Sequence, residues 1–207
     1  MLLEVLRALL LHIDTRESLP NQRIFHHLTD YVKGQFERCG DAACKLDMDI
    51  LGWSTRNLFE LSFVADYVCA SDQNMQRFIG DSAIDDLDIW EKFTTIDQRA
   101  PDYLPHQEST ERISRVNQKL ASLGLTGKRP LQASEIAEAV NRHAEYQELY
   151  RVFSKLAHPT AWAILGGSEE PVVWEKLALL LLLKANRYTG SCLIVIAKKT
   201  GLPIPTV

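Results

Sequence analysis

The C-terminal stretch from about residue 170 to residue 199 is the feature that most constrains the fold of this chain. Pro171 suits the first turn of a helix, Gly201 suits the position after its end, and no other proline lies between them. The run Leu177–Leu183 is apolar on every helical face. A helix of this kind is predicted to lie at the centre of a bundle, or to bury one face against a second copy of the chain.

The remaining periodic segments are also helical, and none shows the alternation of a half-buried strand. Helices are predicted over 2–13, from Asn21 to near Gly40, 45–71, 73–97, 107–122 and 134–158, with Asn141 a point where the last can break. The prolines within 99–105 interrupt the pattern. We therefore expect an all-α bundle forming a single domain over 1–207, with a core of about 20–98 and 134–200 and an insertion at 99–133.

Charge and cysteine usage limit the function classes. The 23 Lys+Arg and 27 Asp+Glu residues give a net charge of −4, so nucleic acid would have to bind a local patch. The four cysteines show no metal-ligand spacing, and Asp81, Asp85, Asp86 and Asp88 lack the EF-hand pattern, so they are predicted to form a solvated face. No metal or cofactor is expected. The leucine run is too short to span a bilayer and no signal peptide is seen, which predicts a soluble, cytoplasmic protein without membrane contact.

Arg151 and His158 are the main candidate catalytic residues. They are seven residues apart, so on a helix both leave one face, with Ser154 between them and Tyr150 one turn before Ser154. Pro159 places His158 at a helix end. An imidazole titrates near neutral pH, and a guanidinium forms a planar fork suited to phosphate oxygens. Together they could cleave RNA. They could also be the polar rim of a packed helix, and for the pair taken alone we rank this structural interpretation first.

Arg56 and Glu60 form a second candidate pair, one helical turn apart. Apolar neighbours make partial burial plausible, and a buried charge needs a partner. In the functional interpretation Glu60 orients His158 and Arg56 adds positive potential. In the structural interpretation, which we rank first, they are an i,i+4 ion pair.

The R-x6-H spacing of Arg151 and His158, on a late helix downstream of Arg56 and Glu60, resembles the HEPN superfamily, and in particular an uncharacterised bacterial HEPN-like family. The resemblance covers about residues 45–200 and is loose between 72 and 135. It implies a HEPN-like antiparallel bundle, commonly dimeric, in which the arginine and histidine cleave RNA without a metal. The chain departs from the pattern at Val152, where HEPN nucleases usually carry a polar residue.

The sequence therefore predicts a metal-independent endoribonuclease acting as a toxin or phage-defence effector. Arg151 and His158 would be catalytic, with Ser154, Tyr150, Arg56 and Glu60 in supporting positions. The expected partners are a second copy of the chain, an RNA substrate and an antitoxin or defence-system protein. The alternative, which Val152 and the acidic charge favour, is a non-catalytic HEPN-like module that binds a nucleotide or a partner protein; a purely structural helical adaptor is a third.

Overall fold

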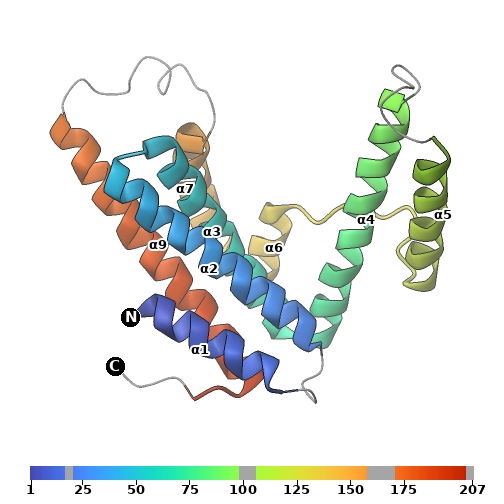
Figure 1. The fold of residues 1–207 in the computed structure, drawn as a ribbon, viewed down its shortest axis with the longest axis horizontal. Coiled ribbons are helices and arrows are strands. Elements are labelled where there is room, and N and C mark those ends of the chain that lie inside the picture. The colour runs from blue at the N-terminus through green and yellow to red at the C-terminus, as the bar shows by residue number, and fades with distance from the viewer. Residues whose placement is uncertain (17–20, 98–105, 158–170, 204–207) are drawn as a thin grey trace. The chain divides into compact units, whose positions relative to one another are not determined.

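The computed structural model describes residues 1–16, 21–97, 106–157 and 171–203, and every regular element in these ranges is an α-helix (Figure 1). The predicted all-α class is therefore confirmed. The helices are α1 (Leu2–Asp14), α2 (Gln22–Lys45), α3 (Met48–Ala70), α4 (Asp72–Asp97), α5 (His106–Ser122), α6 (Ala133–Ala139), α7 (His143–Ala157) and α9 (Pro171–Thr200).

The chain divides into two compact units. The first comprises Met1–Cys69 and Ala133–Val207, and the second comprises Ala70–Gln132. The predicted insertion at 99–133 falls almost entirely within the second unit, which begins earlier and also contains α4.

In the first unit, α2 packs against both α1 and α9, and α1 also contacts α9 (Figure 1). Apolar residues on α2 recur at steps of three and four, which places them on one side of the helix, as in Phe25, Leu28 and Val32. These side chains are buried in the core of the unit. The largest fully buried apolar side chains here are Leu6, Leu9, Ile13, Phe25, Leu51, Leu58, Phe59, Phe63, Leu181, Tyr188 and Ile196.

Helix α9 confirms the predicted bounds, ending just before Gly201, whose φ is 73°. One face of the helix is buried along most of its length, with Leu181, Ala185 and Tyr188 at 1% exposure or less. Its first half also carries exposed leucines, because Leu179 and Leu183 are each 59% exposed. The apolar run therefore contributes less to the core of one chain than the sequence pattern suggests.

The same helix is the one candidate membrane span among the described residues. An 18-residue window within Val172–Thr200 has a mean hydropathy of 1.4, and 39% of that window is buried inside the structure. Length and composition alone give this result, and the core helix of a globular protein can meet the same test. The predicted cytoplasmic location stays a prediction.

The predicted end of α2 near Gly40 is wrong, because the helix continues to Lys45. Cys39 and Ala42 continue its buried stripe, so packing outweighs the low helix propensity of glycine. The helix ends instead at Leu46, which adopts a left-handed φ of 53°. Asp47 then begins the next helix by accepting a hydrogen bond from the Ile50 amide at 3.2 Å.

The predicted break near Asn141 is confirmed. Asn141 has a φ of 58° and lies between α6 and α7, so the two helices are separate elements. The Arg142 amide donates to the Ala137 carbonyl at 2.7 Å across this turn. Arg142 therefore lies in the turn just before α7 begins.

The second unit is built on the contact between α4 and α5. Its core contains Ala83, Ile84, Val116 and Leu120. The prediction of a uniformly solvated acidic face on α4 is wrong for Asp81, which is 7% exposed. Its carboxylate accepts from Arg77 Nη1 at 2.9 Å and from the Leu131 amide at 3.0 Å. Asp81 thus links α4 to Leu131, near the end of this unit.

Candidate functional site at helix α7

Helix α7 carries the candidate site, and its two sides differ in their exposure to solvent. Phe153 and Leu156 are 2% and 7% exposed. Gly52 of α3 allows the close approach: a Cβ atom at that position would lie 2.7 Å from the Leu156 Cβ. Arg151 is on the exposed side of the helix. Packing against α3 therefore fixes which residues of α7 face solvent.

Arg56, Glu60 and Tyr150 come together, although they are distant in sequence. Arg56 Nε donates to Glu60 Oε1 at 3.1 Å, which confirms the predicted ion pair. The two side chains are 17% and 29% exposed, so the pair is partly buried as expected. Arg56 Nη2 also donates to the Tyr150 hydroxyl at 3.3 Å, and Arg56 Cζ lies 4.9 Å from the centre of the Tyr150 ring. The arginine therefore positions the tyrosine.

Tyr146 extends this group along α7 and was missed in the sequence analysis. Its ring stacks on Tyr150 with centroids 4.9 Å apart and an angle of 29°. Burial raises the pKa of Tyr146, and the neighbouring Tyr150 and Glu60 raise it further. The four-residue spacing of the two tyrosines was the available signal, because such residues are neighbours on a helix.

An open pocket of about 430 Å³ lies beside the stacked tyrosines. It is lined by Tyr146, Gln147, Glu148, Tyr150 and Arg151. Among the described residues, none forms a hydrogen bond or ion pair with the Arg151 guanidinium, which leaves its planar fork available to a ligand. The pocket thus contains an available cation and phenolic hydroxyl groups.

Of the two remaining predicted site residues, the structure describes Ser154 but not His158. Ser154 is half-buried and does not line the pocket. His158 lies outside the described residues, so its distance from Arg151 stays a prediction. Val152, the departure from the HEPN pattern, is 47% exposed.

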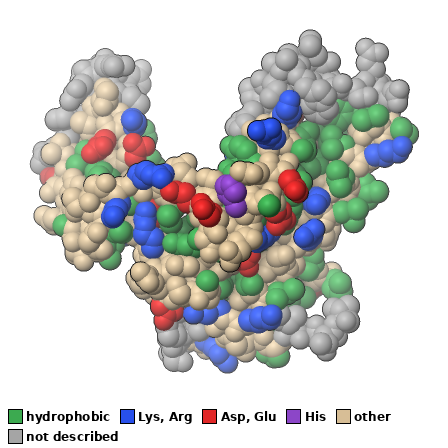
Figure 2. Space-filling view, turned by 180° about the vertical axis from the view of Figure 1, so that it is seen from behind, with side chains coloured by type: hydrophobic (Ala, Val, Ile, Leu, Met, Phe, Trp, Pro, Cys, Tyr) green, Lys and Arg blue, Asp and Glu red, His purple; other side chains and the backbone are tan. Residues whose placement is uncertain are grey.

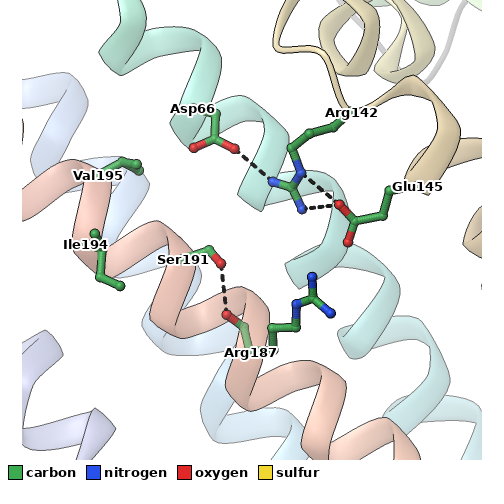
Figure 3. Close-up of a pocket in the computed structure, with 7 residues that line it drawn as sticks. All are labelled: Asp66, Arg142, Glu145, Arg187, Ser191, Ile194 and Val195. Carbon is green, nitrogen blue, oxygen red and sulfur yellow. Dashed lines mark hydrogen bonds and ion pairs between the residues drawn. The ribbon is translucent and has the colours of Figure 1, made fainter. Parts of the chain in front are cut away.

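A second polar pocket, of about 330 Å³, lies near the start of α7 (Figure 3). Arg142 Nη1 donates to Asp66 Oδ2 at 2.8 Å, and its Nε donates to Glu145 Oε2 at 2.8 Å. Arg142 Nη2 also forms an ion pair with Glu145 Oε2 at 2.8 Å. The guanidinium also lies 4.2 Å from the centre of the Phe63 ring. Burial alone would lower the pKa of Arg142, but the hydrogen bonds that it donates to Glu145 and Asp66 raise it.

Tyr188 of α9 is fully buried near this cluster. Burial raises the pKa of its hydroxyl, and the adjacent Glu145 carboxylate raises it further. The Tyr188 hydroxyl and Glu145 Oε1 are both buried without a hydrogen-bond partner of good geometry among the described residues. A neutral phenol next to a carboxylate is consistent with these shifts.

Charges of both signs are interspersed on the face drawn in Figure 2, in keeping with the net charge of −4. Within the described ranges, no group of three His, Cys, Asp or Glu side chains is arranged to bind a metal ion. The local arrangement at each pocket therefore matters more for ligand binding than the overall charge.

The fold and this site define an all-α protein with an arginine–tyrosine pocket on one helix. The chain belongs to a family of unknown function (DUF5677), whose model matches residues 54–170 and so spans α7 and most of α3. Neither the curated proteins nor the solved structures contain a significant match.

Proposed function

We propose that this protein is a metal-independent endoribonuclease of the HEPN type that acts as a toxin or phage-defence effector in the cytoplasm. The observation that carries the proposal is Arg151, an exposed guanidinium without a described partner beside a pocket that also contains Tyr150. His158 follows Arg151 at the spacing of the HEPN motif. The proposal includes a HEPN-like arrangement of the helices.

The proposed chemistry begins at a phosphodiester bound by Arg151. His158 accepts the proton of the ribose 2′-hydroxyl, whose oxygen attacks the adjacent phosphorus. The bond to the 5′-oxygen breaks, that oxygen takes up a proton, and the other product ends in a 2′,3′-cyclic phosphate. The Arg151 fork stabilises charge on the phosphate oxygens in the transition state.

Tyr150 has a defined place in this proposal. Its hydroxyl accepts a hydrogen bond from Arg56, so its own proton remains available to donate to a phosphate oxygen. Glu60 acts through Arg56 by fixing the guanidinium. Tyr150 is therefore assigned to substrate positioning, and Arg56 and Glu60 to support. Ser154 is also assigned to substrate positioning, from its place between Arg151 and His158 in the sequence.

Replacing the proposed acid/base group tests the catalytic claim. His158→Ala should lower RNA cleavage by about 10²–10⁴-fold while the fold persists. Arg151→Lys should also be poor, because lysine keeps the charge and loses the fork. The matched control is Arg115→Lys, the same change at another exposed arginine. A folded His158→Ala protein with wild-type cleavage would refute the proposal.

The products provide an independent test. Cleavage should continue in excess EDTA and leave a 2′,3′-cyclic phosphate or a 3′-phosphate. Magnesium-dependent cleavage that leaves 5′-phosphates would show that the Arg151/His158 chemistry is wrong.

The alternative is a non-catalytic module that binds a nucleotide or a partner protein. The exposed Val152 beside Arg151 favours it, because an apolar surface side chain suits a protein contact better than a phosphate. RNA or nucleotide binding that requires Arg151, without any cleavage, would support the alternative over the nuclease.

We propose a second copy of the chain as the partner for the first half of α9. Val172, Leu179, Leu180 and Leu183 are between 48% and 59% exposed on this segment. Leu183→Asp should convert a dimer to a monomer in light scattering, whereas Leu11→Asp, at a 67% exposed leucine of α1, should not. A wild-type monomer at tens of micromolar would exclude the dimer.

A further inference from the structure

The pocket around Arg142 has polar groups that the proposed nuclease does not use. It is lined by Asp66, Arg142, Glu145, Arg187, Ser191, Ile194 and Val195. Its volume of about 330 Å³ is at the lower end of the range for small-molecule sites. It belongs wholly to the first unit of the chain. Its ligand chemistry can therefore be considered separately from RNA cleavage.

Two of the polar groups retain hydrogen-bonding capacity. Arg142 is engaged by Asp66 and Glu145 through its Nε and both Nη atoms. Asp66 Oδ1 accepts no hydrogen bond from any described residue, and in Figure 3 it points away from Arg142. The pocket therefore presents the Asp66 carboxylate as an acceptor, because Oδ1 is unengaged and Oδ2 accepts one hydrogen bond and has a second lone pair.

Arg187 supplies the complementary donors. Its guanidinium forms no ion pair or hydrogen bond within the part of the chain that the structure describes, and it extends from α9 toward the side where Glu145 lies (Figure 3). The Ser191 hydroxyl donates to the Arg187 carbonyl at 3.1 Å, which occupies its proton. Ile194 and Val195 add an apolar surface.

The ligand that matches this set has a planar apolar face, one edge with two acceptors and another edge with two donors. Among the nucleobases, guanine alone meets this description. Its N7 and O6 accept two hydrogen bonds from an arginine fork, and its N1–H and N2–H groups donate to a carboxylate. Adenine, cytosine and uracil lack one of these two edges. We propose that this pocket binds a guanine base, with Arg187 on the N7/O6 edge and Asp66 on the N1/N2 edge.

The base could belong to a free nucleotide or to an unpaired residue of RNA, and titration calorimetry separates these sources. One arm uses 5′-GMP, 5′-IMP and 5′-AMP. The other uses short 2′-O-methyl RNAs with or without a single guanine, which cannot be cleaved because the attacking hydroxyl is blocked. The result is thus independent of the proposed nuclease activity.

The expected result is a preference for guanine of about 5- to 100-fold over adenine. 5′-IMP, which lacks the N2 amine, should bind more weakly than 5′-GMP. Preference confined to 5′-GMP would identify a nucleotide site, and preference confined to the RNA arm would identify a base-specificity site. Equal binding of guanine and adenine ligands, or no binding of either, would overturn the proposal.

Substitutions of the pocket residues test whether guanine binds at this pocket. Arg187→Gln should remove the preference for guanine, whereas Lys198→Gln, which removes the same charge from an exposed position of α9, should keep it. Arg187 has no described partner, so its substitution should leave the melting temperature unchanged. Asp66→Asn should weaken 5′-GMP more than 5′-IMP, a ratio that partial unfolding would not alter. Unchanged selectivity in Arg187→Gln would place any guanine site elsewhere.

Discussion

The two pockets beside α7 each lie close to two arginines, of which one has protein partners and the other has none among the described residues. Near the start of the helix, Arg142 binds Asp66 and Glu145, and Arg187 has no described partner. Further along, Arg56 binds Glu60 and Tyr150, and Arg151 has no described partner. Beside each pocket, one arginine is bound to neighbouring side chains, and the other is the one that we propose to contact a ligand. The number of arginines in the sequence does not distinguish these two roles, whereas the contacts of each guanidinium do.

This comparison predicts its largest effect at Arg142. Arg142→Ala leaves two mostly buried carboxylates without their cation, so stability should fall by about 2–4 kcal/mol. Arg187→Ala removes the same groups from a position without described partners and should cost no more than about 0.5 kcal/mol. Urea unfolding followed by circular dichroism measures both. Similar losses for the two variants would end the distinction.

Gly52 allows α3 to pack closely against α7, the helix that lines the second pocket, and its substitution tests how much this packing contributes to stability. Gly52→Ala would place a methyl group against Leu156, which should destabilise the protein by about 1–3 kcal/mol. The matched control is Gly34→Ala in α2, where nothing lies within 4 Å of the added atom. That change should stabilise by about 0.5–1 kcal/mol through helix propensity. A neutral Gly52→Ala would mean that α7 shifts easily along α3.

Tyr150 gives a smaller effect. Tyr150→Phe loses the hydroxyl that accepts from Arg56, and we expect a loss of about 0.5–1.5 kcal/mol. Tyr31→Phe, at a 53% exposed tyrosine, should change nothing measurable in the same unfolding experiment. If Tyr150→Phe has full stability but reduced RNA cleavage, the hydroxyl serves the substrate and not the fold.

Cys39 of α2 contacts Thr55 of α3, the helix that also carries Arg56 and Asp66. Burial raises the pKa of its thiol to about 11, although the hydrogen bond between this thiol and the Thr55 hydroxyl opposes the shift. The unfolded thiol ionises nearer pH 8.5. Its contribution to stability is therefore complete below that pH and is lost as the pH rises toward 11. Unfolding measured at pH 8 and pH 10.5 should show a decline that is smaller in Cys39→Ala and unchanged in Cys44→Ala.

Sequence periodicity was sufficient to predict most of the helices, because it indicates which face of each helix is buried. It was insufficient at Gly40, where glycine suggested an end but buried neighbours extend the helix to Lys45. It could propose Arg56 and Glu60 as a pair, because one turn separates them. It could not find the contact to Tyr150, which lies 94 residues away, or the pairing of Arg142 with Asp66. Such contacts depend on how helices pack, which no local pattern specifies.

The left-handed residue Asn141 has a consequence for how this chain can vary in length. In one continuous helix, each inserted or deleted residue would rotate everything downstream by about 100° and turn Arg151 away from its pocket. Asn141 instead ends α6, and α7 starts with an angular phase of its own. Arg142 and Glu145 anchor that phase to Asp66 on α3. A change of length in α6 can therefore be absorbed before the turn, leaving the pocket residues of α7 in register.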